Sequence, residues 1–198
     1  MYKRQVYYLI AHGIRQIIVS LNTGVKAMLG NMLAKKETET LDKTFHTVEF
    51  VLHTVVTLLF GITGILIIPF VEIYTENFTD ANYIRPAFAS LMVMGQAAYC
   101  LRIPYEMMVQ AAGHYKQTQK SSIIEAILNI VTAVVLVLSL GMEGVAISSI
   151  VAMGYRTVYL ALYMKNNILN RSIKHFLKHI FVDAVCICLL YTSPSPRD

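Results

Sequence analysis

The sequence has little charge and no tryptophan. Only 15% of its 198 residues are charged and 56% are hydrophobic, whereas a soluble domain carries about 25% charged residues. A chain of this length cannot cover several fully apolar helices with polar surface. The composition therefore excludes an ordinary soluble domain and indicates helices with lipid as their outer solvent. With 12 tyrosines and no tryptophan, any aromatic belt at the membrane surface must consist mainly of tyrosine.

Motifs for cofactors and catalysis are also missing. The chain has three cysteines, and Cys100 and Cys186 lie in apolar runs without the paired spacing of a disulfide framework or a metal site. There is no phosphate-binding loop, zinc-protease pattern or nucleophile elbow. The sequence pI is about 9.1, but the basic residues are spread between apolar runs, as membrane topology requires. The sequence predicts no cofactor, no metal, no enzymatic activity and no nucleic-acid partner.

The two ends of the chain differ in character from the rest. Residues 188–198 read as the translation of a transposase-end sequencing adapter, and residues 1–5 as its reverse complement; the alternative for the tail is a natural polar extension. We expect residues 6–187 to be native, and such added ends are left out of fold reasoning. Without them the chain has 14 basic and 11 acidic residues in place of 17 and 12, so the formal net charge is +3 rather than +5.

Six apolar runs dominate the remaining sequence. A helix needs about 20 apolar residues to cross the hydrocarbon core, whereas a membrane strand needs only about 10 that alternate in polarity. The lengths of the runs favour helices. The sequence therefore predicts an all-α polytopic transmembrane bundle of five complete helices and one truncated helix, at residues 7–33, 50–74, 83–112, 122–140, 145–164 and from 176 onward.

The connections predict the orientation of the helices. Cytoplasmic loops carry an excess of Lys and Arg, and nine such residues follow the first, third and fifth runs, whereas only Arg85 lies in the alternate loops. Those three loops are therefore expected on the cytoplasmic side. Residues 34–45 alternate Lys with Glu and predict an amphipathic surface segment. Residues 141–144 predict a tight turn, with glycine at each end to release the chain from helical geometry.

Ionisable residues inside the apolar runs are the candidates for function. A charge at bilayer depth costs about 2.5–3.5 kcal/mol on insertion scales, so it normally faces protein or water. We expect Arg15, Glu49 and Glu125 to reach toward an interface, and Arg156 to anchor its helix near the cytoplasmic headgroups. The complete set is Arg15, Lys26, Glu49, Arg102, Glu106, Glu125, Arg156 and Asp183, with His46 and His53.

Arg102 and Glu106 form the most informative pair. They lie one helical turn apart and can pair on one face, and Pro104 between them predicts a kink. Broken helices at mid-membrane occur at transporter binding sites; the alternative is a structural ion pair that locks the kink. Lys26 is either a cavity cation for an anionic substrate or a lysine that extends to the interface.

Two further pairs have the spacing of one helix face. Glu125 and Asn129 lie one turn apart, which favours an interhelical hydrogen bond. His46 and His53 lie seven residues apart, which is weak support for proton coupling.

Three segments resemble a known family. They are AAGHYKQTQKSSIIEAILN at 111–129, GMEGVAI at 141–147 and GNMLA at 30–34. Their order and spacing are similar to the second half of bacterial polysaccharide-biosynthesis membrane proteins. These are lipid-linked oligosaccharide flippases of the multidrug/oligosaccharidyl-lipid/polysaccharide exporter superfamily, which is MATE-like, and the resemblance covers about residues 14 to 180.

The resemblance implies both an architecture and an activity. The family has two lobes of six helices, so residues 6–187 would be most of the C-terminal lobe, and its N-terminal lobe would be a missing partner. The implied activity is flipping of undecaprenyl-pyrophosphate-linked oligosaccharides across the bacterial inner membrane. Lys26, Arg102 and Glu106 would then bind substrate. The alternatives are a drug or cation antiporter with Glu106 as its acidic residue, a membrane glycan polymerase or ligase, and a scaffold that does not transport.

Overall fold

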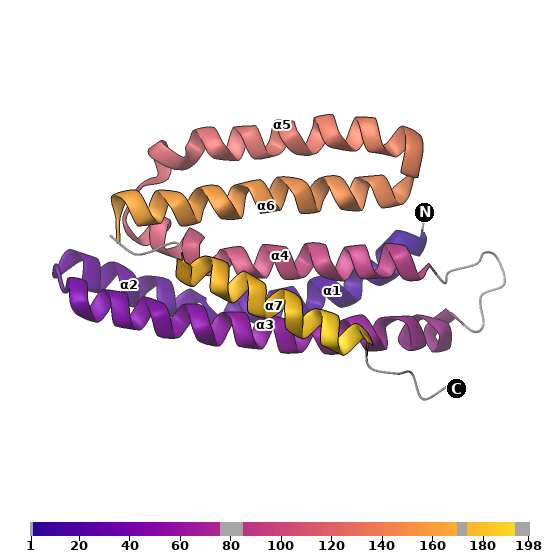
Figure 1. The fold of residues 1–198 in the computed structure, drawn as a ribbon, viewed down its shortest axis with the longest axis horizontal. Coiled ribbons are helices and arrows are strands. Elements are labelled where there is room, and N and C mark those ends of the chain that lie inside the picture. Colours follow the sequence, from indigo (N-terminus) through magenta and orange to yellow (C-terminus); the bar gives the residue numbers. More distant parts are fainter. Residues whose placement is uncertain (1, 76–84, 170–173, 193–198) are drawn as a thin grey trace.

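The computed structural model describes residues 2–75, 85–169 and 174–192, and this part of the chain is helical with no strand. The prediction of an all-α bundle is confirmed (Figure 1). The expected sixth helix is present, and the first predicted helix is divided in two. The helices are α1 Tyr2–Leu21, α2 Thr23–Ala34, α3 Thr38–Thr75, α4 Pro86–Ala111, α5 Tyr115–Leu140, α6 Met142–Asn167 and α7 Lys174–Thr192.

The break in the first apolar run lies at Asn22. Its backbone N–H donates to the carbonyl of Val19 at 3.2 Å, and its side-chain Nδ2 donates to the carbonyl of Ile18 at 2.6 Å. Asn competes with the helical ladder through such local bonds. Helix α4 continues through Pro104, so the proline that predicts a kink does not interrupt this helix.

The segment predicted as an amphipathic surface loop is mostly the start of α3. Only residues 35–37 separate α2 from α3, and Lys36 takes a positive φ of 59° where α2 ends. Leu41 and Phe45 are buried, whereas Lys43 and Glu39 form an exposed ion pair at 2.6 Å. The amphipathic pattern is therefore confirmed, but it extends a long helix rather than forming a separate loop.

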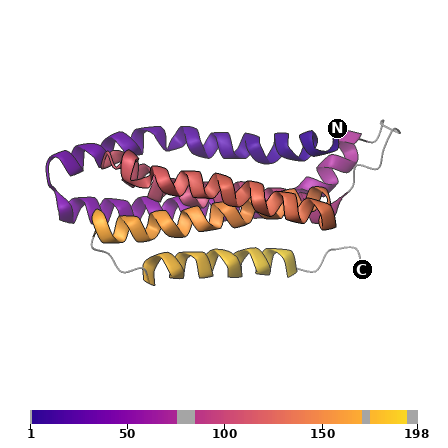
Figure 2. The same ribbon diagram turned by 90° about the horizontal axis from the view of Figure 1, so that it is seen from above.

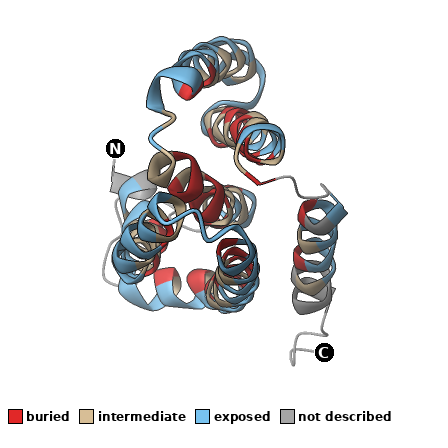
Figure 3. Ribbon diagram, turned by 90° about the vertical axis from the view of Figure 1, so that its left-hand side faces the viewer, coloured by how far each residue is buried: buried red, intermediate tan, exposed pale blue. Residues whose placement is uncertain are grey.

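Helix α4 lies at the centre of the bundle. It packs against α1, α2, α3 and α6, and its buried residues stand out in the end-on view of Figure 3. Four helical stretches are long and apolar enough to cross a membrane: Gln5–Ala34, Thr38–Thr75, Tyr115–Leu140 and Met142–Asn167. Helix α4 is not one of them, because polar residues such as Gln96, Arg102 and Glu106 lower its hydropathy; the neighbouring helices shield these side chains.

Helix α5 lies at the edge of the bundle and packs mainly on α6. Its buried residues are Thr118 and Ser121, whereas large apolar side chains such as Ile130 and Leu138 are exposed. Such a surface requires lipid as its solvent. Helix α7, drawn in yellow in Figure 2, lies along α3 at one side of the bundle.

The α5–α6 hairpin turns at a single glycine. Gly141 has φ 58° and ψ −128°, a backbone conformation open to glycine but strained for other residues. Helix α6 already begins at Met142, so the prediction that glycine releases the helix is right for Gly141 and wrong for Gly144, which is helical. Gly144 instead allows close packing, because an added Cβ would lie 2.4 Å from the carbonyl oxygen of Leu136.

We expect Gly141→Ala to lower the stability of the protein by about 1–3 kcal/mol, since alanine at this positive φ is strained. Gly13→Ala is the matched control, because Gly13 is helical with no atom within 4 Å of an added Cβ, and alanine there gains about 0.5–1 kcal/mol. Thermal denaturation in detergent should show a lower melting temperature for the first variant and an equal or higher one for the second. Equal melting temperatures would contradict the assigned turn.

Candidate functional site

A row of polar side chains follows one face of α4. Gln96, Tyr99, Arg102, Glu106 and Gln110 recur at intervals of three or four residues, which places them on one side of a helix. Arg15 from α1 and Lys26 from α2 reach the same face. We call these seven residues the polar seam.

Arg15 is held against α4 by neutral groups. Its Nη1 donates to Gln96 Oε1 at 3.2 Å, and its Cζ lies 4.1 Å from the centre of the Tyr99 ring. Its Nε is buried without a hydrogen-bond partner. The prediction that Arg15 extends to an interface is wrong, because amide and aromatic partners hold it inside the bundle. No carboxylate in the described residues pairs with it, so its charge is not neutralised.

Lys26 lies at the other end of the seam. Its Nζ donates to Gln110 Oε1 at 2.8 Å, and Gln110 Nε2 in turn donates to Glu106 Oε1 at 3.5 Å. These three residues line a cavity of about 270 Å³ together with Asn22 and Tyr99. The cavity therefore opens beside the break between α1 and α2, with a cation and a carboxylate separated by an amide.

Arg102 is buried behind this cavity. It is 8% exposed, its Nη1 lies 2.7 Å from Glu125 Oε1, and its Nε lies 3.5 Å from Glu106 Oε2. The expected pair with Glu106 is present, but the contact with Glu125 on α5 is shorter. The structure thus brings Lys26 and Glu106 together at the cavity and places Arg102 between two carboxylates.

Glu125 joins three helices. Its Oε2 lies 3.7 Å from Arg156 Nε, while its other oxygen binds Arg102. Arg156 also donates from Nη1 to Ser121 Oγ at 3.2 Å and to the hydroxyl of Ser122. Glu125 therefore pairs with arginines inside the bundle and does not extend to an interface, whereas the position of Arg156 relative to the headgroups stays a prediction.

Asn129 continues the polar contact between α5 and α6. Its side-chain oxygen accepts a hydrogen bond from Ser148 Oγ at 3.0 Å. The predicted interhelical hydrogen bonding of this pair is confirmed, because Asn129 bonds to α6 and Glu125 to α4. The bond fixes the register of the hairpin below the turn.

Glu49 differs from its prediction, and the two histidines of α3 differ from each other in burial. Glu49 is 1% exposed and accepts a hydrogen bond from Tyr105 at 2.7 Å, so it does not extend to an interface. His53 is buried against Asp183 of α7 at 2.6 Å, and His46 is exposed. These residues lie outside the polar seam.

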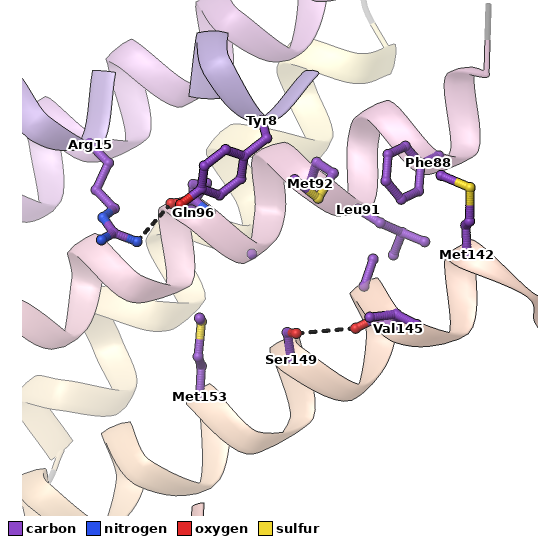
Figure 4. A pocket seen from close by; sticks show the side chains of 12 residues that line it. Tyr8, Arg15, Phe88, Leu91, Met92, Gln96, Met142, Val145, Ser149 and Met153 are labelled. Carbon is purple, nitrogen blue, oxygen red and sulfur yellow. Dashed lines mark hydrogen bonds between the residues drawn. The ribbon is translucent and has the colours of Figure 1, made fainter. Parts of the chain in front are cut away.

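A second cavity lies at the Arg15 end of the seam, between α1, α4 and α6. It has a volume of about 250 Å³, and Arg15 and Gln96 are its charged and amide groups. Figure 4 shows these two side chains on one side of the cavity and Met92, Met142 and Met153 around the remainder. Flexible thioethers adapt to irregular apolar surfaces, so this cavity combines a cation with an adaptable apolar wall.

The balance of charge along the seam is positive. Counted with the bridge of Glu125 and Arg156, the site contains Arg15, Lys26, Arg102 and Arg156 against two carboxylates, Glu106 and Glu125. Sequence reasoning missed the roles of Arg15 and Arg156, which lie 81 and 35 residues from partners that they meet only in the fold. The sequence did contain one indication of the site: Gln96, Tyr99 and Arg102 are spaced so that they share one face of α4.

The apolar helices are long enough to span a membrane, and cavities between them contain the cations Arg15 and Lys26. This combination defines a multi-pass membrane protein with cavities suited to a polar solute. Residues 6–135, more than half of the chain, match the family described as MatE. The chain belongs to the MatE family, whose members are membrane transporters. No curated protein and no solved structure matches the chain.

Proposed function

We propose that the protein moves lipid-linked oligosaccharides, of the undecaprenyl-pyrophosphate type, across the bacterial inner membrane for cell-surface polysaccharide synthesis. The observation that carries this proposal is the way the seam holds Arg15 and Lys26. Each hydrogen-bonds to the side-chain amide of a glutamine, so each keeps a positive charge beside a cavity. A pyrophosphate that enters the bilayer needs such charges to offset its lost hydration.

In this proposal one cavity binds the polar part of the substrate and the other binds the apolar part. The cavity at Lys26 is lined by amides and a carboxylate, which are partners for sugar hydroxyls. The cavity at Arg15 has an apolar, methionine-containing wall, which suits a group attached to a lipid. In this proposal Lys26 contacts substrate, Glu106 orients Gln110, and Arg102 supports Glu106 from behind.

The resemblance to two-lobe flippases supplies the remainder of the proposal. In this proposal an N-terminal lobe like that of two-lobe flippases closes the seam from the opposite side and completes the route. The lipid tail would stay in the bilayer while the charged headgroup passes along the seam. The partners are therefore the lipid-linked glycan, the bilayer and the second lobe of the same protein.

A drug or cation antiporter is the competing function within the same superfamily. It needs an acidic cavity, and Glu106 lines two of the described cavities. However, Arg102 lies 3.5 Å from that carboxylate, which reduces its attraction for a cation. The excess of positive charge along the seam favours an anionic substrate over a cationic one.

The test is a double variant, Arg15→Gln/Lys26→Gln, in the full-length transporter of cells that depend on it for surface glycan. We expect export to fall at least about tenfold at normal protein levels, since two charges that offset the pyrophosphate are lost. Surface glycan measured by immunoblot against membrane protein abundance gives the readout. Lys43→Gln is the control, because Lys43 is exposed and pairs with Glu39 at the surface.

Glu106→Gln separates the two functions. A flippase should retain export, because glutamine at 106 can still accept the hydrogen bond from Gln110 and the seam becomes more cationic. An antiporter should lose cation efflux, because Glu106 is the acidic residue of the cavities described above. Full export by the double variant at wild-type abundance would remove Arg15 and Lys26 from the proposed route.

A further inference from the structure

A second group of ionisable side chains lies between α3 and α7, apart from the polar seam. It consists of Glu49 and His53 on α3 and His179 and Asp183 on α7, and we call it the acid–histidine cluster. The two members on each helix lie four residues apart, so each pair lies on one face. Helix α7 packs chiefly on α3, and the cluster occupies that interface.

Asp183 is fully engaged by α3. It is 6% exposed, its Oδ2 lies 2.6 Å from His53 Nδ1, and its Oδ1 accepts a hydrogen bond from Thr57 Oγ1 at 2.8 Å. An ionised carboxylate only accepts hydrogen bonds, so Nδ1 of His53 carries the proton. Asp183 thereby fixes the tautomer of the imidazole.

The other ring nitrogen of His53 is the unusual atom. Nε2 is buried and has no hydrogen-bond partner. In the tautomer that Asp183 imposes, Nε2 has a free lone pair directed into the protein. Buried polar atoms are normally paired, and a proton that binds here gains the adjacent carboxylate as its counter-charge.

Two further imidazole rings lie between His53 and the surface. The His179 ring lies 5.0 Å from that of His53, and the His46 ring lies 6.3 Å from that of His179. His46 is exposed, whereas the side chain of His179 is 15% exposed. The exposure of the three imidazoles therefore falls from His46 at the surface to the buried His53.

The charged and titratable groups around His53 come from three helices. Asp183 and His179 belong to α7, Tyr105 to α4, and Glu49 and His46 to α3 itself. Helices α1 and α2 also pack against α3, but neither makes a hydrogen bond, ion pair or ring contact with His53 in the described part of the chain. Without a bound proton the cluster contains two carboxylates and neutral imidazoles.

We propose that the acid–histidine cluster is a proton-binding site, in which Nε2 of His53 takes a proton from a hydronium ion, which leaves as water. The product is an imidazolium that donates from Nδ1 to Asp183, and no other bond changes. A proton suits the site better than a metal ion, since no group of three or more His, Cys, Asp or Glu in the described residues could hold a metal.

Proton binding also affects how α7 docks. Across this interface Asp183 of α7 lies 2.6 Å from His53 of α3, and Glu49 of α3 lies 3.9 Å from His179 of α7. An imidazolium at His53 adds a charge attraction to Asp183 across the interface. The occupied site therefore strengthens the packing of α7 on α3.

The experiment is nitrogen-15 NMR of the full-length protein with labelled histidine, reconstituted in liposomes. Between about pH 8 and about pH 5, where imidazoles titrate, Nε2 of His53 should change from unprotonated to N–H while Nδ1 stays protonated. In Asp183→Asn the affinity for that proton should fall at least about tenfold, because an amide cannot offset the imidazolium charge. Loss of the signal in His53→Gln assigns it.

Two further variants keep the result interpretable. His53→Gln/Asp183→Asn retains a hydrogen-bonding pair across the interface, so it should fold and lack the transition. His114→Gln, which removes a histidine bound to Tyr163 outside the cluster, should leave the transition of His53 unchanged. An Nε2 with one protonation state throughout this pH range, or a transition unaltered in Asp183→Asn, would overturn the proposal. The measurement needs no substrate, so it is independent of the transport assay.

Discussion

Replacing Glu125 with alanine is expected to destabilise the protein by about 3–5 kcal/mol, the cost of leaving a buried ion pair without one partner. Glu125 binds Arg102 at 2.7 Å and Arg156 at 3.7 Å, and both arginines are 8% exposed. Its removal leaves two guanidinium groups inside the bundle without their shared carboxylate. Thermal denaturation in detergent and protein abundance in membranes should both show the loss.

Glu39→Ala is the control for this experiment. Glu39 also forms an ion pair, with Lys43 at 2.6 Å, but its side chain is 83% exposed. An exposed pair one turn apart on a helix contributes only about 0.3–0.5 kcal/mol. If Glu125→Ala unfolded at the same temperature as Glu39→Ala, the three-helix bridge would contribute no stability.

A second test asks whether the loss of stability comes from unpaired charge when only Glu125 is removed from the bridge. Replacement of a complete buried ion network by apolar residues of similar size is often neutral or stabilising. The triple variant Arg102→Met/Glu125→Leu/Arg156→Met should therefore be much more stable than Glu125→Ala alone. A triple variant as unstable as the single one would assign the loss to packing rather than to unpaired charge.

Gly144→Ala has the second largest expected effect, a loss of about 3 kcal/mol, at the upper end of the cost of overpacking. The added Cβ would lie 2.4 Å from the carbonyl oxygen of Leu136 and 2.5 Å from its carbonyl carbon. These are backbone atoms of α5, so a change of rotamer cannot relieve the contact. The two helices of the hairpin must separate, and the melting temperature should fall.

Gly154→Ala gives a control within the same helix. An added Cβ at Gly154 would meet no atom within 4 Å, and alanine is favoured over glycine inside a helix by about 0.5–1 kcal/mol. The Gly154 variant should thus be as stable as the parent or more so. Equal losses in the two variants would indicate a general intolerance of α6 rather than a close approach to Leu136.

The helices were predictable because run length and hydropathy are local properties. The apolar stretches of α5 and α6 exceed what a membrane span needs, and the structure confirms both. The ends were less predictable, since α3 continues backward through a charged segment whose Leu41 and Phe45 are buried only by tertiary packing. Proline at 104 predicted a kink, and α4 continues through it, whereas the break that the sequence did not predict lies at Asn22, where side-chain bonding to Ile18 competes with the helix.

The site was less predictable because its contacts join distant positions. Spacing of four residues predicted the Arg102–Glu106 pair correctly, but nothing local distinguishes Glu125 as the closer partner. His53 and Asp183 are separated by 130 positions, so only the fold brings them together. The chemistry of each embedded residue could therefore be stated from sequence, whereas its partner could not.

The position of α4 has a consequence for how the protein enters the membrane. This helix carries Arg102 and Glu106 and is less hydrophobic than its neighbours. Its transfer into lipid as a single helix is therefore less favourable than theirs. Its neutralising residue, Glu125, is synthesised 23 residues later, on a helix apolar enough to insert unaided. We therefore expect α4 to insert stably only after the ribosome has synthesised the α5–α6 hairpin.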